Sequence, residues 1–559
     1  MNHPAARATP PPWAKSYPPG QSPDVRLDTW PVHSLIERSV ERWSTRDAFV
    51  FRERSITYAE LKREVDRAAT GFVRAGIGAG SRVALLLPNT LYHPLAFFGA
   101  LKAGATIVHL SPLDGPRVIA HKLTDSGART VITTNIGELA IVAAKLLDAD
   151  LIDRLIVADD AAFGPSPLTG PLPSDDRITA WADFVSGEPA EFPPDDLNRL
   201  ALIQYTGGTT GLPKGAMLTH ANLSAAQSAY TLWSRAENLA QPGEERVLLV
   251  LPLFHIYALS SVMLRAVADG QTMVIHTRFD PEAALAEIER GVSVFPGVPT
   301  MWIAMMALPG FETRDIGSLR YCASGGAPLP VEVARKLKAM TGIELLGGWG
   351  MTEASPAGIN IPKGWPQKAG TIGLPLPGIY VDIVALDDPS RVLAPGEVGE
   401  LRIFGQNVMQ GYLNCAAETA ESFSDGGFLT GDIGYMDEDG FFFIVDRKKD
   451  LIISGGYNVY PQLVEQAIYE HPDVEEVLVI GVPDTYRGES AKAFIKLRSG
   501  AEPLALETLR DFLKSRVGPH EMPRALEIRT ALPRTAVGKL SKLELKREEA
   551  ERAMPARAS

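Results

Sequence analysis

Cysteine is almost absent from this sequence: its 559 residues include only Cys322 and Cys415, which are far apart and lack the spacing of metal ligands. A disulfide framework is therefore not expected, and the composition fits a protein of the reducing cytoplasm. An excess of basic residues is absent too, since the formal net charge is −12 at pH 7. This acidic balance argues against a general nucleic-acid binder, which would normally have a basic surface.

Long uninterrupted apolar runs are also scarce. The proline-rich N-terminus, residues 1–24, lacks the apolar core of a signal peptide, so we expect a tail that lies over the surface or is disordered. The run from Val247 to Leu264 is long and uncharged enough to raise the question of a transmembrane helix. Pro252, His255 and a pair of serines interrupt it, so we expect a buried strand, a turn and a core helix instead.

The remaining composition is that of a globular protein, with 45% hydrophobic and 22% charged residues. The length predicts two or more domains. Between residues 40 and 160 strand-like and helical patterns alternate, which predicts a mostly parallel sheet with helices on its faces. The expected strands are Val83–Leu87, Thr106–Leu110 and Thr130–Thr133, and the expected helices are Leu91–Ala103 and Val118–Thr124.

The character of the sequence changes twice after this region. Residues Gly370–Asp446 contain short strands broken by Pro-Gly and Gly-Glu turns, which favours a small antiparallel barrel or sheet. After Lys449 the pattern predicts a compact α+β unit. Its expected elements are helices Leu463–Glu470 and Leu504–Val517 and strands Glu475–Gly481 and Ala491–Leu497.

Residues Tyr205–Gly215 are the most informative stretch of the chain. They follow an apolar, strand-like run, Leu200–Gln204, and contain four glycines, three threonines and one lysine in eleven positions. Glycines let successive backbone N–H groups converge on an anion, and hydroxyl and ammonium groups add donors, so this loop is typical of polyphosphate binding. Pro213 stands where a Walker A loop needs glycine before its lysine, so the pattern is a different phosphate loop.

Further clusters of unusual composition follow the phosphate loop. Glycines beside Trp349 would let a planar base lie between backbone and ring, Asp432 could accept from both ribose hydroxyls, and Glu353 offers a hard oxygen ligand for Mg²⁺. Each cluster alone is more typical of a turn or a solvated charge pair, but their joint order along the chain is not expected by chance. The clusters are Ser324–Pro328, Gly347–Glu353, Thr430–Asp432, Asp446–Asp450 with Ser454–Gly456, and Pro533–Lys539.

With these motifs the chain resembles the adenylate-forming superfamily, and within it the fatty acyl-CoA and related carboxylate–CoA ligases. The resemblance covers about Leu35 to Leu545. It implies an α/β fold with a large N-terminal adenylation domain, residues 25–448, of two mixed α/β sheet layers plus a small β-barrel. A small mobile α+β C-terminal lid domain, residues 449–559, would follow.

The same resemblance implies a two-step reaction. A carboxylate first attacks the α-phosphate of ATP, which gives an acyl-adenylate and pyrophosphate. The thiol of CoA then attacks the acyl carbonyl and AMP leaves. ATP, Mg²⁺ and CoA as co-substrate are therefore the expected small-molecule partners, together with a carboxylic acid.

The resemblance also assigns contacts with the nucleotide. Thr352 would contact the α-phosphate and Glu353 would hold Mg²⁺. Asp432 and Arg447 would bind ribose. The loop that embraces the β- and γ-phosphates comprises Thr206, Gly207, Gly208, Thr209, Thr210, Gly211 and Lys214. The adenine site comprises Gly325, Gly326, Ala327 and Trp349, with Gly348, Gly350 and Met351 beside it. Trp349 stands where tyrosine is commoner, so the stacking face is kept and the hydroxyl is lost.

Lys539 matches the lysine that bridges the attacking carboxylate and the α-phosphate, where a positioned ammonium offsets the repulsion between two negative groups. A lysine acetyltransferase that modified Lys539 would erase this charge and switch off the first step. His255 matches a histidine near the carboxylate and the path of the thiol, although a lone histidine after an apolar strand is more often a core residue. Lys449 falls at the hinge of the lid domain. The residues expected to face the thiol are Ser454, Gly455 and Gly456.

The acid itself is left open by these motifs. A medium- or long-chain fatty acid is favoured, and a dicarboxylic or aromatic acid is the alternative. The apolar segments Phe295–Met306 and His255–Met263 are the expected walls of its pocket. An adaptable lining would come from Met301, Trp302, Met305 and Met306, although such residues are more often plain core.

Two other functions stay open. The protein could load an adenylated acid onto a separate carrier protein instead of CoA, since the chain contains no carrier motif. It could also be an inactive nucleotide-binding scaffold. A scaffold predicts a broken site, whereas the charged residues that the chemistry needs are all present in the sequence. These are Lys214, Glu353, Asp432, Arg447 and Lys539.

Overall fold

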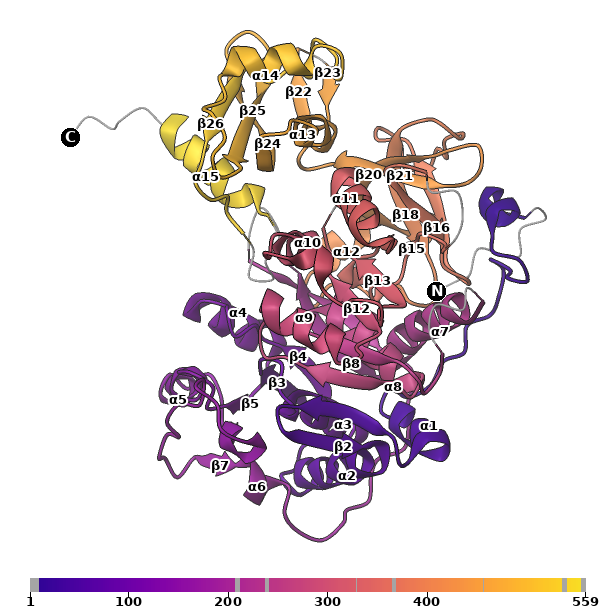
Figure 1. Cartoon of the computed structure of the whole chain (residues 1–559). Coiled ribbons are helices and arrows are strands. Elements are labelled where there is room, and N and C mark those ends of the chain that lie inside the picture. Colours follow the sequence, from indigo (N-terminus) through magenta and orange to yellow (C-terminus); the bar gives the residue numbers. More distant parts are fainter. Residues whose placement is uncertain are drawn as a thin grey trace.

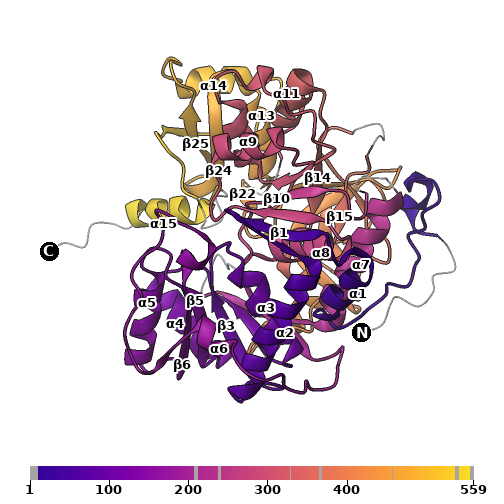
Figure 2. The same cartoon turned by 60° about the horizontal axis from the view of Figure 1, so that its bottom comes forward.

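The computed structural model describes residues 10–206, 212–236, 241–327, 329–363, 368–455, 457–534 and 540–553. It confirms the α/β class, with two large sheets and a smaller third sheet near the C-terminus (Figure 1). In the turned view, the elements of the third sheet lie at the opposite end of the molecule from α2 (Tyr58–Arg74) and α3 (Tyr92–Lys102) (Figure 2).

The first large sheet has seven strands in the order β7-β6-β5-β3-β4-β8-β9. Neighbours from β7 to β8 pair in parallel, whereas β8 and β9 form an antiparallel hairpin. The expected alternation of helices and strands in this region is confirmed, close to the expected boundaries. The strands are β3 (Arg82–Leu86), β4 (Thr106–His109), β5 (Thr130–Thr134), β6 (Arg154–Ala158), β7 (Ile178–Ala180), β8 (Leu200–Thr206) and β9 (Lys214–Thr219).

Helices cover both faces of this sheet. Helix α3 is apolar on all sides and buried along almost its whole length, as a helix enclosed between two layers must be. With α2 it belongs to the large core shared by the two sheets. On the other face, α4 (Pro116–Ser126) and α5 (Leu139–Asp148) form a separate core with side chains of β3, β4 and β5.

The second large sheet is one continuous hydrogen-bonded path, β17-β18-β20-β21-β16-β15-β14-β13-β12-β10-β11-β1-β2, with β19 paired to β20. Six strands from β14 to β1 run in parallel, because helices α9 (Pro281–Glu289), α10 (Pro299–Met306) and α11 (Val331–Thr341) alternate with several of them. The parallel strands are β1 (Asp47–Phe51), β10 (Arg246–Leu249), β11 (Thr272–Ile275), β12 (Val294–Gly297), β13 (Tyr321–Ser324) and β14 (Leu345–Trp349).

The other part of this sheet is antiparallel, as the turns between Gly370 and Asp446 predict. Its strands are β15 (Ile359–Asn360), β16 (Thr371–Pro375), β17 (Tyr380–Val384), β18 (Gly399–Phe404), β19 (Phe423–Ser424), β20 (Gly427–Met436) and β21 (Phe442–Arg447), and β2 (Arg54–Thr57) closes the far edge. The remaining helices of the large domain are α1 (Ser34–Trp43), α6 (Trp181–Phe184), α7 (His220–Ala236), α8 (Arg265–Ala268) and α12 (Ala416–Glu421).

The apolar run after Val247 folds as expected, into strand β10, a turn and a helix. The helix, η3 (Tyr257–Leu264), is a π-helix, a rare form that is frequently found at functional sites. Within the described ranges no helix is both long and apolar enough to cross a membrane.

The C-terminal sheet has five strands and its own apolar core. They are β22 (Ile452–Ser454), β23 (Tyr457–Val459), β24 (Val474–Asp484), β25 (Gly488–Leu497) and β26 (Ala525–Ile528), with helices α13 (Pro461–Tyr469), α14 (Leu506–Leu513) and α15 (Lys542–Ala553). Helix α14 is shorter than the expected Leu504–Val517. Leu509 and Leu513 are buried, but Lys514–Arg516 are exposed, and Val517 packs against the core after the helix has ended.

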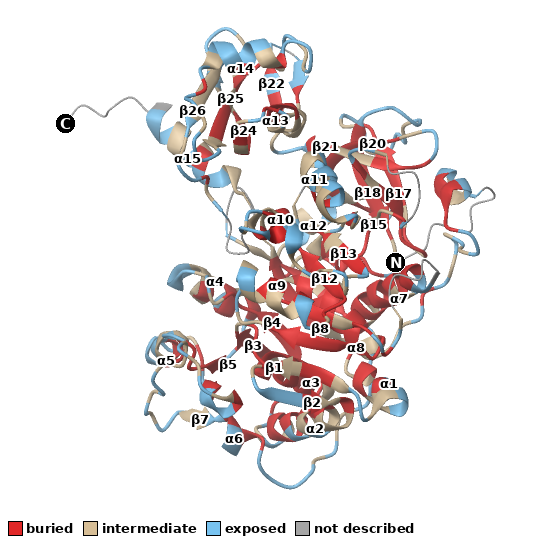
Figure 3. Ribbon diagram, in the orientation of Figure 1, coloured by how far each residue is buried: buried red, intermediate tan, exposed pale blue. Residues whose placement is uncertain are grey.

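The described part of the N-terminal segment is ordered against the large domain. The side chain of Trp13 is only 1% exposed, and its ring lies 4.9 Å from that of Tyr380 and 5.7 Å from that of Phe442. The hydroxyl of Ser16 donates to the carbonyl of Asp439 at 2.7 Å. In Figure 3 this segment, partly buried and partly exposed, lies on the side of the molecule that carries the antiparallel strands. Proline content predicted a surface segment but not the buried indole within it.

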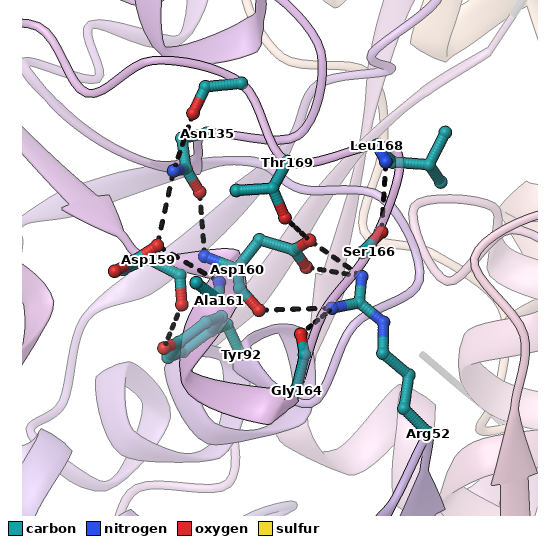
Figure 4. Close-up of polar contacts among 11 residues, drawn as sticks. Arg52, Tyr92, Asn135, Asp159, Asp160, Ala161, Gly164, Ser166, Leu168 and Thr169 are labelled. Atoms are coloured by element: carbon teal, nitrogen blue, oxygen red, sulfur yellow. Dashed lines mark hydrogen bonds and ion pairs between the residues drawn. The ribbon is translucent and has the colours of Figure 1, made fainter.

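A buried polar cluster links residues that follow strands of the two large sheets (Figure 4). Arg52, which follows β1, donates to both carboxylate oxygens of Asp160 at 2.7 Å. Asp160 follows β6 and also accepts from the hydroxyl of Thr169 at 2.8 Å, while its N–H donates to Asn135 at 2.7 Å. Because the Asp160 side chain is fully buried, its charge depends on these partners.

We expect Asp160→Asn to lower the free energy of unfolding by about 3–5 kcal/mol, because it leaves Arg52 buried without its counter-charge. Urea denaturation measures the change. The matched control is Asp148→Asn, since the Asp148 side chain is 69% exposed in its pair with Arg177 and should contribute about 0–1 kcal/mol. Equal effects of the two substitutions would contradict a structural role for the buried pair.

Candidate active site

The expected site residues follow strands at one edge of each large sheet. Strand β8 leads into the phosphate loop after Thr206, and in the other sheet β10, β13 and β14 lead to His255, Gly325 and Trp349. The carboxyl ends of parallel strands meet at the same edge of a sheet, which is where ligands bind in α/β folds. The topology therefore explains why motifs so far apart in the sequence can form one site.

The two ends of the phosphate loop lie directly opposite each other. Thr206 and Lys214 are partners in the β8–β9 hairpin. The ammonium group of Lys214 lies 5.4 Å from the centre of the Tyr412 ring and 3.9 Å from the carboxylate of Glu418. The half-exposed Lys214 is thus held near an aromatic face at the base of the loop, with only a weak ion pair.

Glu353 also contacts Tyr412. It sits in the short helix η5 (Thr352–Ala354) and is only 7% exposed. The Tyr412 hydroxyl donates to Glu353 Oε1 at 2.8 Å. Burial raises the pKa of the Glu353 carboxyl, and the Tyr412 hydroxyl acts in the opposite direction. Lys214 and Glu353, a predicted phosphate contact and a predicted Mg²⁺ ligand, therefore share one neighbour.

The backbone after Glu353 is braced by a buried amide. Ser355 has a positive φ of 63°, unusual for a residue other than glycine, and its hydroxyl donates to the Asn407 carbonyl at 2.8 Å. The side-chain amide of Asn407 donates in turn to the carbonyls of Ala354 and Ala357 at 2.7 and 2.8 Å. These bonds hold the Thr352–Glu353 turn in one conformation.

Trp349, Asp432 and Arg447 form one cluster. Asp432 on β20 and Arg447 on β21 are direct partners across the antiparallel ladder. The Trp349 indole N–H donates to Asp432 Oδ2 at 2.7 Å, and Arg447 Nε lies 3.0 Å from Asp432 Oδ1. The structure thus brings the residues expected at the base and at the ribose into contact.

Gly325 follows β13 and lies against the Tyr257 ring. A Cβ at this position would come within 2.8 Å of Tyr257 Cζ and 3.0 Å of its hydroxyl oxygen, so only glycine allows this approach. Gly326, with a φ of +76°, and Ala327 continue the turn. In the other predicted cluster, Gly348 belongs to β14, and Gly350 and Met351 connect β14 to η5.

His255 lies in the turn between β10 and η3. The ring Nδ1 of His255 accepts from the backbone N–H of Tyr257 at 3.2 Å. The backbone N–H of His255 donates to the carbonyl of Pro252 at 2.9 Å. An acceptor Nδ1 places the proton of the neutral imidazole on Nε2. The ring is half-buried, so it is not an enclosed core histidine.

The expected hinge and thiol-facing residues lie in the C-terminal part. Lys449 stands between β21 and β22, and Lys546 of α15 donates to its carbonyl at 3.4 Å and to Asp450 at 2.6 Å. Ser454 is 4% exposed at the end of β22, and Gly455 has a φ of +60° in the turn to β23. Seven predicted site residues lie outside the described residues, namely Gly207, Gly208, Thr209, Thr210, Gly211, Gly456 and Lys539.

Sequence reasoning missed Tyr412 and Asn407. Both belong to a loop between β18 and α12 with no glycine-rich or charged motif. The sequence gives only a weak indication of Asn407. Its amide side chain stands in a short stretch between the apolar residues Phe404 and Val408, and a buried amide in such a place is expected to form hydrogen bonds.

Comparisons with known proteins match most of the chain. The family described as AMP-binding enzyme matches residues 36–413, and AMP-binding enzyme C-terminal domain matches residues 463–539. The chain is 36% identical to "Long-chain-fatty-acid--CoA ligase" of Bacillus subtilis (strain 168), covering 97% of this chain and 98% of the relative. It is also 36% identical to "Feruloyl-CoA synthase" of Amycolatopsis sp, covering 88% and 94%.

Solved structures agree over similar lengths. ATP-bound MatB from Rhodopseudomonas palustris superposes with a TM-score of 0.82 at 27% identity, covering 92% of this chain and 98% of MatB. The anthranilate CoA ligase AuaEII, in complex with anthranoyl-AMP, superposes with a TM-score of 0.84 at 25% identity, covering 95% and 99%.

We expect Tyr412→Phe to lower the free energy of unfolding by about 1.5–3 kcal/mol at pH 8, because the buried Glu353 carboxylate loses a hydrogen bond. The loss should shrink toward acidic pH: the hydroxyl lowers the pKa of Glu353, so its contribution exists while the carboxylate is ionised. Urea denaturation at several pH values measures both effects. Tyr486→Phe, at a residue 85% exposed, is the control; a pH-independent loss would contradict this reading.

Proposed function

The chain belongs to the AMP-binding enzyme family, as an AMP-forming acid–CoA ligase, and on this premise we propose that its acid is a medium- or long-chain fatty acid. One observation carries the choice of acid. Relatives described as long-chain-fatty-acid–CoA ligases match 96–97% of this chain at 34–36% identity, and the feruloyl-CoA synthase, 36% identical over 88% of the chain, makes an aromatic acid the alternative. The apolar wall expected for an alkyl chain supports it, since four α10 residues are at most 9% exposed: Met301, Trp302, Met305 and Met306.

In the first step, an oxygen of the acid's carboxylate forms a bond to the α-phosphorus of ATP, and pyrophosphate leaves. We assign Thr352 to the α-phosphate and the loop from Thr206 to Lys214 to the β- and γ-phosphates. Lys539 would lie between the carboxylate and the α-phosphate. A cation at that point stabilises the charge that develops as two anions meet.

Mg²⁺ would be held by Glu353. The residue fits a hard cation, because its Oε1 already has the Tyr412 hydroxyl as donor and Oε2 can face a metal. Among the described residues no group of three or more histidine, cysteine or acidic side chains could bind a metal, so phosphate oxygens and water would complete the coordination. The bound metal would neutralise phosphate charge during the displacement.

Asp432 is suited to the ribose hydroxyls even though Trp349 and Arg447 already contact it. Each carboxylate oxygen can accept two hydrogen bonds, and among the described residues each has one side-chain donor, so each can accept another. The Trp349 indole would also carry the stacking face for adenine, together with the backbone of Gly325–Ala327 and of Gly348–Met351. In this assignment the Trp349 N–H supplies a polar contact of its own, because it donates to Asp432 Oδ2 and orients that carboxylate.

In the second step the sulfur of CoA attacks the acyl carbonyl, AMP leaves, and a thioester forms. We propose that residues 25–448 form the adenylation domain and that residues 449–559 rotate about Lys449 between the steps, which brings Ser454, Gly455 and Gly456 to the thiol. Three large side chains near that turn support a docking face: Ile453, Tyr457 and Tyr486 are 55%, 63% and 85% exposed. His255 would lie beside the reacting carbonyl.

We expect Lys539→Ala to abolish pyrophosphate exchange while leaving thioester formation from supplied acyl-adenylate intact, because the lysine serves only the first displacement. Lys514→Ala is the matched control: this exposed lysine on the same domain pairs with Asp511 and should affect neither step. If both half-reactions fall together in Lys539→Ala, the assignment is wrong.

A panel of acids tests the substrate class. We expect CoA-dependent AMP release to be highest with saturated monocarboxylic acids of medium or long chain, since the expected wall offers apolar contact. Dicarboxylic and aromatic acids measure the alternatives, and an isolated carrier protein replaces CoA in a parallel arm. A preference for ferulate would reverse the choice of acid. Absence of pyrophosphate exchange with every acid would favour an inactive scaffold.

A further inference from the structure

Gln204 connects the strand of the phosphate loop to the turn that carries His255. It lies on β8 two residues before Thr206, so both side chains lie on the same face of the strand. Gln204 is 6% exposed, and its Nε2 donates to the carbonyl of Phe254 at 3.0 Å. Phe254 is the residue immediately before His255. The motif-based assignment of the site includes neither Gln204 nor this contact.

The orientation of the Gln204 amide follows from its partners. The Phe254 carbonyl can only accept, so the amide nitrogen must face it, and Gln204 Oε1 then faces His109 Nδ1 at 2.9 Å. His109 Nδ1 must therefore carry the proton. Burial lowers the pKa of His109 to about 4, so the ring is neutral at physiological pH and this tautomer is fixed. The neighbouring His93 is neutral too, because burial lowers its pKa.

Asn89 holds the same turn from a second side. It follows β3, is 2% exposed, and its Nδ2 donates to the carbonyl of Leu251 at 2.9 Å while its Oδ1 accepts from the N–H of Leu253 at 2.8 Å. One buried side chain thus mimics a strand partner for this segment. Between them, Asn89 and Gln204 bind three backbone groups in the four residues before His255.

We propose that Gln204 is a positioning residue, which with the support of Asn89 fixes His255 relative to the phosphate loop. The bonds cross from the carboxyl edge of the seven-stranded sheet to the turn after β10 of the other sheet, and so hold together two parts of the site that come from different layers. The proposal rests on the proposed function, in which His255 lies beside the reacting carbonyl. A displacement of about 1 Å in such a group can cost about a hundred-fold in rate.

The test substitutes Gln204→Met, which keeps the length of the side chain and removes both polar contacts. We expect kcat for acyl-CoA formation to fall about ten- to hundred-fold with the KM for ATP unchanged, because Phe254 is no longer held. In a His255→Ala background the same substitution should have no further effect, since Gln204 acts through His255. Independent, multiplying losses in the double variant would overturn the proposal. Gln204→Asn, too short to reach both partners, gives the same cycle if Gln204→Met folds poorly.

Two further measurements separate positioning from mere stability. Amide hydrogen exchange of residues 251–256 should become faster in Gln204→Met, and unchanged exchange would overturn the proposal even if no acid were a substrate. Asn135→Leu is the matched control: this amide is 2% exposed, donates to the Gly170 carbonyl at 3.0 Å, and lies in the remote polar cluster (Figure 4). It should lower Tm without changing kcat or exchange of 251–256. If the wild-type protein were inactive with every acid, that result would refute the proposed function, and the hydrogen-exchange result would still decide whether Gln204 holds residues 251–256.

Discussion

The carboxylate of Asp432 is the contact on which the candidate site depends. It joins the last parallel strand of the large sheet, through the Trp349 indole, to the antiparallel strand that carries Arg447. Asp432 is only 4% exposed, so a charge there needs these donors to be tolerated. Because a carboxylate oxygen can accept more than one hydrogen bond, the same buried acid can hold the parallel and antiparallel parts of the sheet together and, in the proposed function, receive a ligand's hydroxyl groups.

The chemistry of the site comes from residues whose type is visible in the sequence, and its geometry from residues that are not. Glycine, threonine and lysine near Thr206 form a recognisable phosphate pattern because their chemistry is local to a few positions. Tyr412, by contrast, affects Glu353 across 59 residues of chain, and Gln204 reaches Phe254 across 50. Such contacts depend on strand order, which no local pattern encodes.

The fold shows the same division. Alternating patterns located the strands of the parallel sheet well, since period and length are local properties. The continuity of β15 and β16 with β14 was not foreseen, because it depends on which edges meet after the chain has turned. The end of α14 was misplaced for a related reason: helical propensity continues beyond Leu513, but the next three residues, Lys514–Arg516, are exposed and add no packing to the helix.

The buried indole at Trp13 ties the start of the chain to strands that are synthesised very late. Ser16 bonds to Asp439, 423 residues further along. At a synthesis rate of about 5–20 residues per second, the partner surface emerges roughly 20–85 s after Trp13 has left the ribosome. Throughout that interval the large aromatic side chain lacks the surface against which it packs in the folded protein, so this segment reaches its final place only after the antiparallel strands have been made.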